Sequence, residues 1–474
     1  QFSVPCMPLR PSHLLRLAHS FKRTAVTSPS KKVFHRSVPS SSSSSNSPSS
    51  PFTNQPLPTL KHRMGSVMEG GREKVWSDRT TDTGDVKDTF TRVRPDSPIP
   101  EDIRKRAHFL CAQYLGGAWK TAQLSAFTIQ QITGGMSNLL FLVKLCPTLP
   151  LENTEPRQAL LRIHCQADID QLLSESVVFT LLSERNLGPK LLGVFPGGRF
   201  EEFIPSRALQ CMEISEDRLS KIIAPMVARV HSLDVPIGKE PQLINRARGW
   251  LDKWSAYEVA INGIEMYCTQ AQVDPSKFPA RLTVQDLSAE LDFVEKFIDS
   301  IHSPVVFSHN DLQEGNILLI NKETDEDPDE LALIDFEYCD YNYRGFDFGN
   351  HFCEYGIDYA YDSAPFYTTY KHKFQAADQR RRFCQAYLKE MHELQAKGLR
   401  IPADILSGDE SRDLSKLEEE AELFMPISHI FWSCWALLNA EQSSIAFGYA
   451  DYARDRMALY YEMKPQLEKY LHSH

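Results

Sequence analysis

The sequence of 474 residues lacks the patterns of several protein classes. Its ten cysteines form no CxxC pair and no Cys/His cluster at zinc-ligand spacing, which argues against a structural zinc site and indicates free thiols in a reducing compartment. No run of 18 or more apolar residues occurs, so we predict no membrane span. Residues 1–68 contain no Asp or Glu; they hold nine of the 52 Lys and Arg, which leaves 43 against all 62 acidic residues in the remainder. That balance argues against a nucleic-acid-binding protein, which needs a basic surface.

The first 95 residues differ in composition from the rest. Residues 40–45 are an unbroken serine run, prolines recur between residues 48 and 58, and no helical or strand period is sustained. We therefore expect residues 1–95 to be a disordered, basic, Ser/Pro-rich head. An acid-free start rich in Arg and Ser also fits an organelle transit peptide.

From about residue 100 the sequence becomes periodic. After residue 205 the pattern is mostly helical, but a strand is predicted over 305–308. Two short apolar runs at 317–320 and 331–334 flank an acidic, turn-rich segment, as the strands of a hairpin do. The earlier elements predicted from periodicity are a helix over 103–115, strands over 127–132, 139–145 and 159–163, and a helix over 169–184.

The strongest chemical signal is the run from His309 to Asn316, HNDLQEGN, followed 24 residues after Asp311 by a second carboxylate, Asp335. In kinase-type phosphotransferases, one Asp of the catalytic loop deprotonates the acceptor hydroxyl, and an Asn five residues later binds Mg²⁺. A second Asp after a hairpin binds the metal ions on the ATP phosphates. Asp311, Asn316 and Asp335 meet that spacing, so we predict an ATP- and Mg²⁺-dependent phosphotransferase. His309 is interpreted as a brace of the loop.

A glycine turn between the first two predicted strands is a second signal. Gly134 and Gly135 lead through Met136, Ser137 and Asn138 into the second strand. Glycine adopts the positive φ of a tight hairpin, so backbone N–H groups and the Ser137 hydroxyl can approach ATP phosphates there. By itself such a turn is weak evidence, because many hairpins need glycine.

Arg162, on the next predicted strand, stands where a kinase places the cation that pairs with phosphate. Glu175 on the following predicted helix could hold it. An ordinary exposed strand arginine is the alternative interpretation.

Aromatic residues are dense after Asp335 and again near the end of the chain. Trp432 and Trp435 are three residues apart on one predicted helix face. Aromatic faces beside a carboxylate, such as Glu354, can bind a quaternary ammonium by cation–π attraction. Aromatics at helical spacing are also typical of a plain core, so both interpretations stay open. The remaining aromatics of interest are Tyr338, Tyr341, Tyr343, Phe346, Phe352, Tyr355, Tyr359 and Tyr452.

These segments resemble the choline/ethanolamine kinase family over roughly residues 100–465. The resemblance implies a bilobal, protein-kinase-like α+β fold. It has a small, β-rich ATP-binding lobe over residues 100–205 and a larger, mostly helical catalytic and choline-binding lobe over 206–474. The segments that carry the likeness are 134–138, 203–207, 305–319, 334–338, 341–347, 350–354 and 447–453.

The resemblance also implies an activity: transfer of the γ-phosphate of ATP to choline, the first step of phosphatidylcholine synthesis from choline, with ethanolamine as a secondary substrate. ATP and Mg²⁺ would be the cofactors, and a cytoplasmic homodimer the assembly. Asp311 would be the base, Asn316 and Asp335 the Mg²⁺ ligands, and Asp347 a brace of the catalytic loop. The nucleotide would contact Gly134, Gly135, Met136, Ser137, Asn138, Arg162, Glu202, Phe203, Ile204, Arg207, Gln313 and Asp335, and choline would contact Tyr338, Glu354, Tyr359, Trp432, Trp435 and Tyr452.

Two departures from the family pattern fall on the ATP side. The chain has Arg162-Ile163-His164-Cys165 where the family usually has Arg-Leu-Tyr-Gly, and Glu202 where it often has Gln. Neither removes the base or a metal ligand, so we expect altered nucleotide affinity at most.

Four alternatives remain in view. An ethanolamine kinase would share the catalytic residues but would want oxygen acceptors for a primary ammonium. An antibiotic phosphotransferase would be expected to present acidic clusters rather than Trp432 and Trp435. A protein kinase is disfavoured by the missing Ala-Pro-Glu motif. A non-enzymatic scaffold of the same fold is disfavoured because Asp311, Asn316 and Asp335 are all present.

Overall fold

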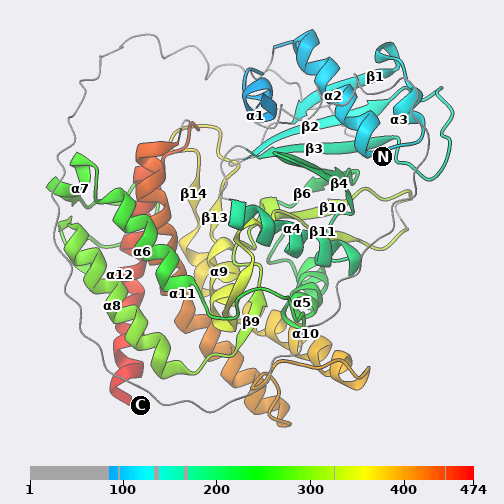
Figure 1. Cartoon of the computed structure of the whole chain (residues 1–474). Coiled ribbons are helices and arrows are strands. Elements are labelled where there is room, and N and C mark those ends of the chain that lie inside the picture. The colour runs from blue at the N-terminus through cyan, green and yellow to red at the C-terminus, as the bar shows by residue number, and fades with distance from the viewer. Residues whose placement is uncertain are drawn as a thin grey trace, which may run out of the picture. The chain divides into compact units, whose positions relative to one another are not determined.

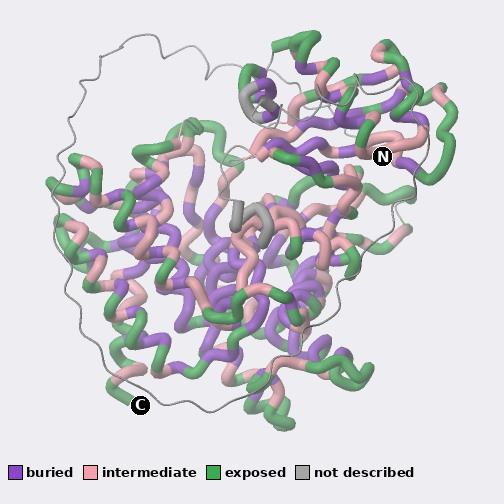
Figure 2. The backbone as a smooth tube through the Cα atoms, in the orientation of Figure 1, coloured by how far each residue is buried: buried purple, intermediate pink, exposed green. Residues whose placement is uncertain are grey.

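The computed structural model describes residues 85–93, 97–132, 138–164, 169–324, 326–443 and 445–473. They belong to one compact unit that begins at Thr83. Within it, a region built on a β-sheet and a mostly helical region each enclose a hydrophobic core (Figure 1, Figure 2). The architecture is mixed α+β, which confirms the predicted fold class.

A five-stranded antiparallel sheet forms the first region, in the order β1-β2-β3-β5-β4. Its first two strands pair from Phe127 opposite Leu145 to Ile132 opposite Leu140, as the arms of the predicted hairpin should. The turn of that hairpin, with Gly134, Gly135, Met136 and Ser137, lies outside the described residues. The strands are β1 (Phe127–Ile132), β2 (Asn138–Leu145), β3 (Gln158–His164), β4 (Leu191–Phe195) and β5 (Gly198–Glu202).

One face of this sheet carries the smaller core. Side chains alternate along a strand, so Leu161 and Ile163 of β3 are buried in this core, whereas Arg162 between them points the other way. That alternation leaves Arg162 on the face used by the site described below. The helices that contribute to the core are α1 (Asp85–Phe90), α2 (Glu101–Tyr114) and α3 (Ala118–Thr121).

Helix α1 corrects one expectation. Val86 and Phe90, four residues apart on one helix face, are buried in the smaller core, and the Phe90 ring lies 5.2 Å from that of Phe141. The expected disorder as far as residue 95 is therefore wrong for residues 85–93. Composition did not reveal this helix because its stability comes from packing rather than from its own six residues.

Short strands after residue 203 flank the loop over residues 309–316, which we call the catalytic loop because it carries the predicted base. A three-stranded sheet has the order β11-β10-β6, and its β10–β11 pair is the predicted hairpin. A two-stranded sheet pairs β9 with β12. The strands are β6 (Ser206–Ala208), β9 (Val305–Ser308), β10 (Ile317–Ile320), β11 (Leu331–Leu333) and β12 (Asp340–Tyr343), and short 3-10 turns η4 (Glu314–Asn316) and η5 (Phe336–Tyr338) follow β9 and β11.

The larger core lies among the helices of the second region, where α11 packs against α6, α9 and α12 (Figure 1). Helix α4 follows β3 in the chain, yet its Val178, Phe179 and Leu182 belong to this larger core. The two cores therefore do not divide the chain at residue 205, and the boundary between the lobes at that residue remains a prediction. The helices are α4 (Ile169–Glu184), α5 (Asp217–His231), α6 (Leu243–Trp254), α7 (Glu258–Asn262), α8 (Val284–Ile301), α9 (Arg344–Glu354), α10 (Ala377–Ala396), α11 (Glu410–Gln442) and α12 (Tyr449–Ser473).

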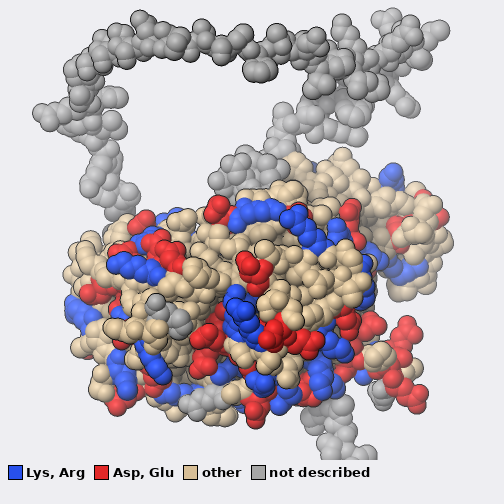
Figure 3. Space-filling view, turned by 90° about the horizontal axis from the view of Figure 1, so that it is seen from below, with Lys and Arg blue, Asp and Glu red and all other residues tan. Residues whose placement is uncertain are grey.

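Among the described helices, α11 alone has the length and apolar composition of a membrane span. Of its apolar window, 89% is buried inside the protein, which is what the central helix of a globular core shows. On the face seen in Figure 3, Lys and Arg side chains are interspersed with Asp and Glu, as on an ordinary hydrated surface.

Candidate active site

Asp311 and Asn316 face each other across the loop that follows β9. The Asn316 Nδ2 donates to the backbone oxygen of Asp311 at 2.8 Å and to its carboxylate Oδ2 at 2.9 Å. Asn316 is buried, and the turn η4 fixes its position. Because an amide also carries an acceptor oxygen, Asn316 can hold Asp311 and present an oxygen to a cation at the same time.

The Asp311 carboxyl lies in a strongly acidic environment. Burial raises its pKa well above the ordinary value for Asp, and the charges of Glu354, Asp335 and Glu337 raise it further. A carboxylate with a raised pKa is a better proton acceptor. The site therefore favours both a general base and a bound cation that would relieve the repulsion.

Asp335 stands at the end of β11, before η5, with a φ of 62°. This left-handed conformation is uncommon for a residue other than glycine, Asn or Asp. Its Oδ1 lies 3.8 Å from Nη1 of Arg162. This pair joins the five-stranded sheet to the catalytic loop region.

Arg162 takes part in a buried ion network that the sequence did not reveal. Its Nε lies 2.7 Å from Oε1 of Glu201, and Arg199 Nε lies 2.7 Å from the same oxygen. Arg199 Nη1 in turn pairs with Glu175 at 2.7 Å. Burial works against the charge of Arg162, but Glu201, Asp335 and Glu175 together raise its pKa.

Two expectations about this strand are therefore corrected. Arg162 is 7% exposed and is not an ordinary surface arginine, and Glu175 contacts Arg199 rather than Arg162. The reason is the register of β3 and β5, which sets Arg162 opposite Arg199, while Glu201, two residues after Arg199, lies on the same face and contacts both arginines. The alternation Arg199-Phe200-Glu201 is the sequence feature that could have indicated this network, but it can be interpreted only once the pairing of the strands is known.

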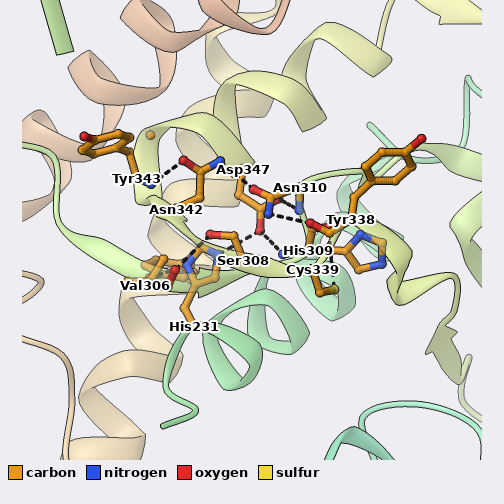
Figure 4. Close-up of polar contacts among 12 residues, drawn as sticks. His231, Val306, Ser308, His309, Asn310, Tyr338, Cys339, Asn342, Tyr343 and Asp347 are labelled. Carbon is orange, nitrogen blue, oxygen red and sulfur yellow. Dashed lines mark hydrogen bonds and ion pairs between the residues drawn. The ribbon is translucent and has the colours of Figure 1, made fainter. Parts of the chain in front are cut away.

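The backbone of the catalytic loop is held by one carboxylate (Figure 4). Asp347 accepts from the backbone N–H of His309 at 2.9 Å and from that of Asn310 at 2.8 Å. Asn310, whose φ is 66°, also donates through Nδ2 to the backbone oxygen of Tyr338 at 2.9 Å. His309 is buried, with Nε2 3.1 Å from the backbone oxygen of Ile334, so it braces the loop as predicted.

The aromatic residues predicted to contact choline lie beside this loop in two groups. In the first, the Trp432 ring lies 5.3 Å from Tyr338 and 5.5 Å from Trp435, and Trp435 Nε1 donates to the Tyr338 hydroxyl at 3.0 Å. Trp432 is 5% exposed and donates to Asn350 at 2.7 Å. Trp435 is only partly buried. Trp432 is thus a core side chain as well as a member of this aromatic group.

The second group surrounds a buried carboxylate. The Tyr359 hydroxyl donates to Glu354 Oε2 at 2.8 Å and lies 2.9 Å from the Tyr452 hydroxyl. Arg456 Nη1 is 3.4 Å from Glu354 Oε1. Burial raises the pKa of Glu354, although Arg456 and the Tyr359 hydroxyl act in the opposite direction.

Two residues absent from the predicted set join the groups into one wall. Tyr449 lies 5.5 Å from Trp435, and Phe447 lies 4.9 Å from Tyr449 and 5.6 Å from Tyr452. Arg456 was missed as well. The sequence feature that could have revealed it is its position four residues after Tyr452 on the same helix, where the two side chains share one face.

The residues predicted for the nucleotide side are only partly placed. Asn138 begins β2, and Gln313 accepts from the backbone N–H of Gly315 at 2.7 Å. The Glu202 carboxylate accepts from Lys190 N at 3.1 Å, and Arg207 pairs with Glu213 at 2.6 Å. Phe203 and Ile204 lie on the connection between β5 and β6. Nucleotide contact by these residues stays a prediction.

An Asp and an Asn on one loop, a second Asp after a hairpin and an arginine on the facing sheet form the arrangement expected of an ATP-dependent phosphotransferase of the protein-kinase-like class. A family model described as Choline/ethanolamine kinase matches residues 129–461. The chain belongs to the choline/ethanolamine kinase family and is an ATP-using kinase.

Individual relatives agree with that assignment. Choline kinase A2 of Caenorhabditis elegans is 44% identical over 403 residues, which cover 79% of this chain and 89% of the relative. Choline/ethanolamine kinase of Homo sapiens is 40% identical over 386 residues, covering 80% and 91%. The crystal structure of a choline kinase from Cryptosporidium parvum shares the fold, with a TM-score of 0.59 at 24% identity, over 77% of this chain and 96% of that one.

Proposed function

We propose that the protein transfers the γ-phosphoryl group of ATP to the hydroxyl of choline, with ethanolamine as a secondary acceptor. The observation that carries the proposal is the position of the aromatic wall beside the catalytic carboxylate. The pKa of Tyr338 and that of Tyr452 are raised, first by burial and in part by the charge of Asp311. Contacts also join each group to the loop that carries Asp311: the Tyr338 backbone oxygen accepts from Asn310 Nδ2 at 2.9 Å, and the Tyr359 N–H donates to Glu314 Oε1 at 3.4 Å.

In the proposed reaction, the choline oxygen attacks the γ-phosphorus while its proton passes to Asp311. The bond from the γ-phosphorus to the β,γ-bridging oxygen breaks, so phosphocholine and ADP leave. Asn316 holds the Asp311 carboxylate toward the acceptor through its 2.9 Å hydrogen bond. Positioning of this kind supplies most of the catalysis in phosphoryl transfer, because little covalent chemistry falls to the protein.

Asn316 and Asp335 are the residues that would hold Mg²⁺. Bound there, the ion would neutralise charge on the ATP phosphates. The residues present suit it, since an amide oxygen and a carboxylate are hard ligands and the acidic surroundings of Asp311 attract a cation. Among the described residues no three His, Cys, Asp or Glu side chains gather as a metal site. Phosphates and water would complete the coordination.

On the nucleotide side, we assign phosphate contact to Arg162 and to the turn with Gly134, Gly135, Met136 and Ser137. Arg162 is held rigidly by Glu201, which favours a fixed cation rather than a mobile one. The remaining proposed contacts are Asn138, Glu202, Phe203, Ile204, Arg207, Gln313 and Asp335.

The acceptor pocket suits choline first. A trimethylammonium group donates no N–H bond and is bound by aromatic faces with a carboxylate nearby. Tyr338, Trp432, Trp435 and Tyr452 supply the faces and Glu354 the charge. The Tyr359 hydroxyl and Glu354 also offer oxygen acceptors to a primary ammonium, which supports secondary use of ethanolamine. An ethanolamine kinase is the alternative.

A coupled ADP-release assay on the full chain tests this function. Mg²⁺-ATP would be combined in turn with choline, ethanolamine and an aminoglycoside, with Asp311→Asn as the matched control. We expect kcat/KM to be highest with choline, lower with ethanolamine and at background with the aminoglycoside. A higher kcat/KM with ethanolamine would favour the alternative, and no turnover with any acceptor would contradict the proposal.

The assembly and location are proposed on the family resemblance alone: a homodimer in the cytoplasm. The predicted two-lobe division belongs to the same set of proposals, whereas residues 1–84 of the predicted head lie outside the described residues. Light scattering of the purified full chain would give the molar mass. A mass of one chain would contradict the dimer. Imaging of the tagged chain would test the location.

A further inference from the structure

Asp347 depends on a histidine that lies far away in the sequence. His231, the last residue of α5, is fully buried, and its Nε2 lies 3.0 Å from Asp347 Oδ2 (Figure 4). The same Oδ2 accepts the backbone N–H of His309. The imidazole and the catalytic loop therefore share one carboxylate oxygen.

The other ring nitrogen of His231 has a partner of its own. Nδ1 lies 3.0 Å from the hydroxyl of Tyr387 on α10. Asp347 already accepts two backbone N–H groups, and an ionised carboxylate only accepts, so Nε2 of the imidazole must donate to it. In a neutral imidazole the remaining Nδ1 is then an acceptor, and the Tyr387 hydroxyl donates to it. Tyr387 thus selects the tautomer that serves Asp347.

Packing holds this arrangement in place. The His231 ring lies 5.5 Å from Tyr387 and 6.0 Å from Phe348, and Phe348 lies 4.8 Å from Tyr387. His231 and Tyr387 are each 0% exposed, so water cannot replace either partner without opening the core. Burial alone would raise the pKa of Asp347, but the hydrogen bond from His231 lowers it.

We propose that His231 and Tyr387 are positioning residues for phosphoryl transfer, which keep Asp347 oriented to hold the backbone of His309 and Asn310 and thereby set the direction of Asp311. The inference rests on the proposed function. Neither residue touches the acceptor pocket formed by Tyr338, Trp432, Trp435, Glu354, Tyr359 and Tyr452. Their loss should therefore change kcat and leave the KM values of choline and ATP nearly unchanged.

The test compares His231→Gln, His231→Ala and Tyr387→Phe with the wild type, using the full chain. Gln can still present an N–H to Asp347 from the same distance along the side chain, whereas Ala cannot. We expect His231→Ala to lower kcat by about 100-fold, the scale of loss for a misplaced catalytic group. His231→Gln should stay within about fivefold of the wild type and Tyr387→Phe should lose about tenfold, in each case through kcat.

Two matched controls separate positioning from general damage. Tyr355→Phe removes an equally buried hydroxyl that lies outside the chain from Tyr387 to Asp347. His429→Gln changes an equally buried histidine, whose Nε2 lies 3.5 Å from Cys353 Sγ. Both controls should keep kcat within about twofold of the wild type.

A second measurement needs no acceptor. Hydrogen exchange of the His309 and Asn310 amides should be at least about tenfold faster in His231→Ala, while the amides of α8 and β10 keep their protection. The inference is overturned if Tyr387→Phe loses no more kcat than Tyr355→Phe, if Gln fails to restore what Ala loses, or if the two amides exchange at the wild-type rate. If the wild type has no choline turnover, the proposed function fails on its own, and the exchange measurement still decides whether His231 orders the loop.

Discussion

The Asn316 side chain donates to the Asp311 carboxylate over 2.9 Å, which places the predicted metal ligand against the predicted base. One amide therefore orients the proton acceptor and can still face a cation. The charge of Asp335 also raises the pKa of Asp311, so both predicted partners act on the predicted base. Their separate contributions can be resolved by substitution.

Asp311→Ala and Asp335→Ala should both abolish turnover without unfolding the protein, but for different reasons. Loss of the base removes about 100- to 10,000-fold in kcat and leaves nucleotide binding intact. Loss of Asp335 should weaken Mg²⁺-dependent ATP binding. Single-turnover kinetics with calorimetric titration of Mg²⁺-ATP measures both effects, and circular dichroism checks the fold. A near-normal rate in either variant would remove that residue from the mechanism.

Replacement of Glu201 should change the free energy of unfolding and the ATP KM more than replacement of Glu175. Glu201 lies between two buried arginines, and its replacement by Gln leaves part of their charge uncompensated, at a cost on the order of 3 kcal/mol in the free energy of unfolding. The ATP KM should rise with it, because Arg162 loses its anchor. Glu175→Gln is the matched control, since the ion pair of Glu175 is with Arg199. Denaturant melts and ATP saturation curves give both quantities. Equal effects of the two variants would contradict this ordering.

How much of the fold and of the candidate site was predictable depends on how far apart the contacting residues are in the sequence. Asp311, Asn316 and Asp335 lie within 25 residues and follow a fixed spacing, so the motif alone predicts them as one group. Strand β9 and helix α4 have the predicted bounds because their periods are local. The Arg162–Glu201 pair instead needs the register of two strands, and His231 contacts Asp347 across 116 positions. No local pattern encodes such contacts.

Replacement of Trp432 by Ala and replacement of Trp435 by Ala should differ in their effects on stability. Trp435 is partly exposed, so Trp435→Ala should raise the choline KM by about tenfold or more with little change in stability. Trp432 is buried and bonded to Asn350, so Trp432→Ala should also cost about 3–5 kcal/mol in the free energy of unfolding. Choline and ATP saturation curves with thermal melts test this. If Trp435→Ala raises both KM values equally, Trp435 is core rather than pocket.

The pH dependence should report the raised pKa of Asp311. Turnover requires the carboxylate, so kcat/KM for choline should fall as the pH drops through a pKa above that of an ordinary Asp. The same shift has a stability consequence. A carboxyl whose pKa is higher in the folded state contributes stability below its unfolded pKa of 3.8, and this stability is lost as the pH rises through the folded pKa.

Glu337→Gln isolates the electrostatic part of that shift. Removing one neighbouring negative charge lowers the pKa of Asp311, so the acidic limb of the kcat/KM profile should move to lower pH by a few tenths of a unit or more. Glu330→Gln, on the exposed end of the β10–β11 hairpin, is the control and should leave the limb in place. Higher Mg²⁺ should move the limb in the same direction as Glu337→Gln, because a cation also stabilises the charged form. A limb that moves to higher pH in Glu337→Gln would show that the titrating group is not a carboxyl repelled by its acidic neighbours.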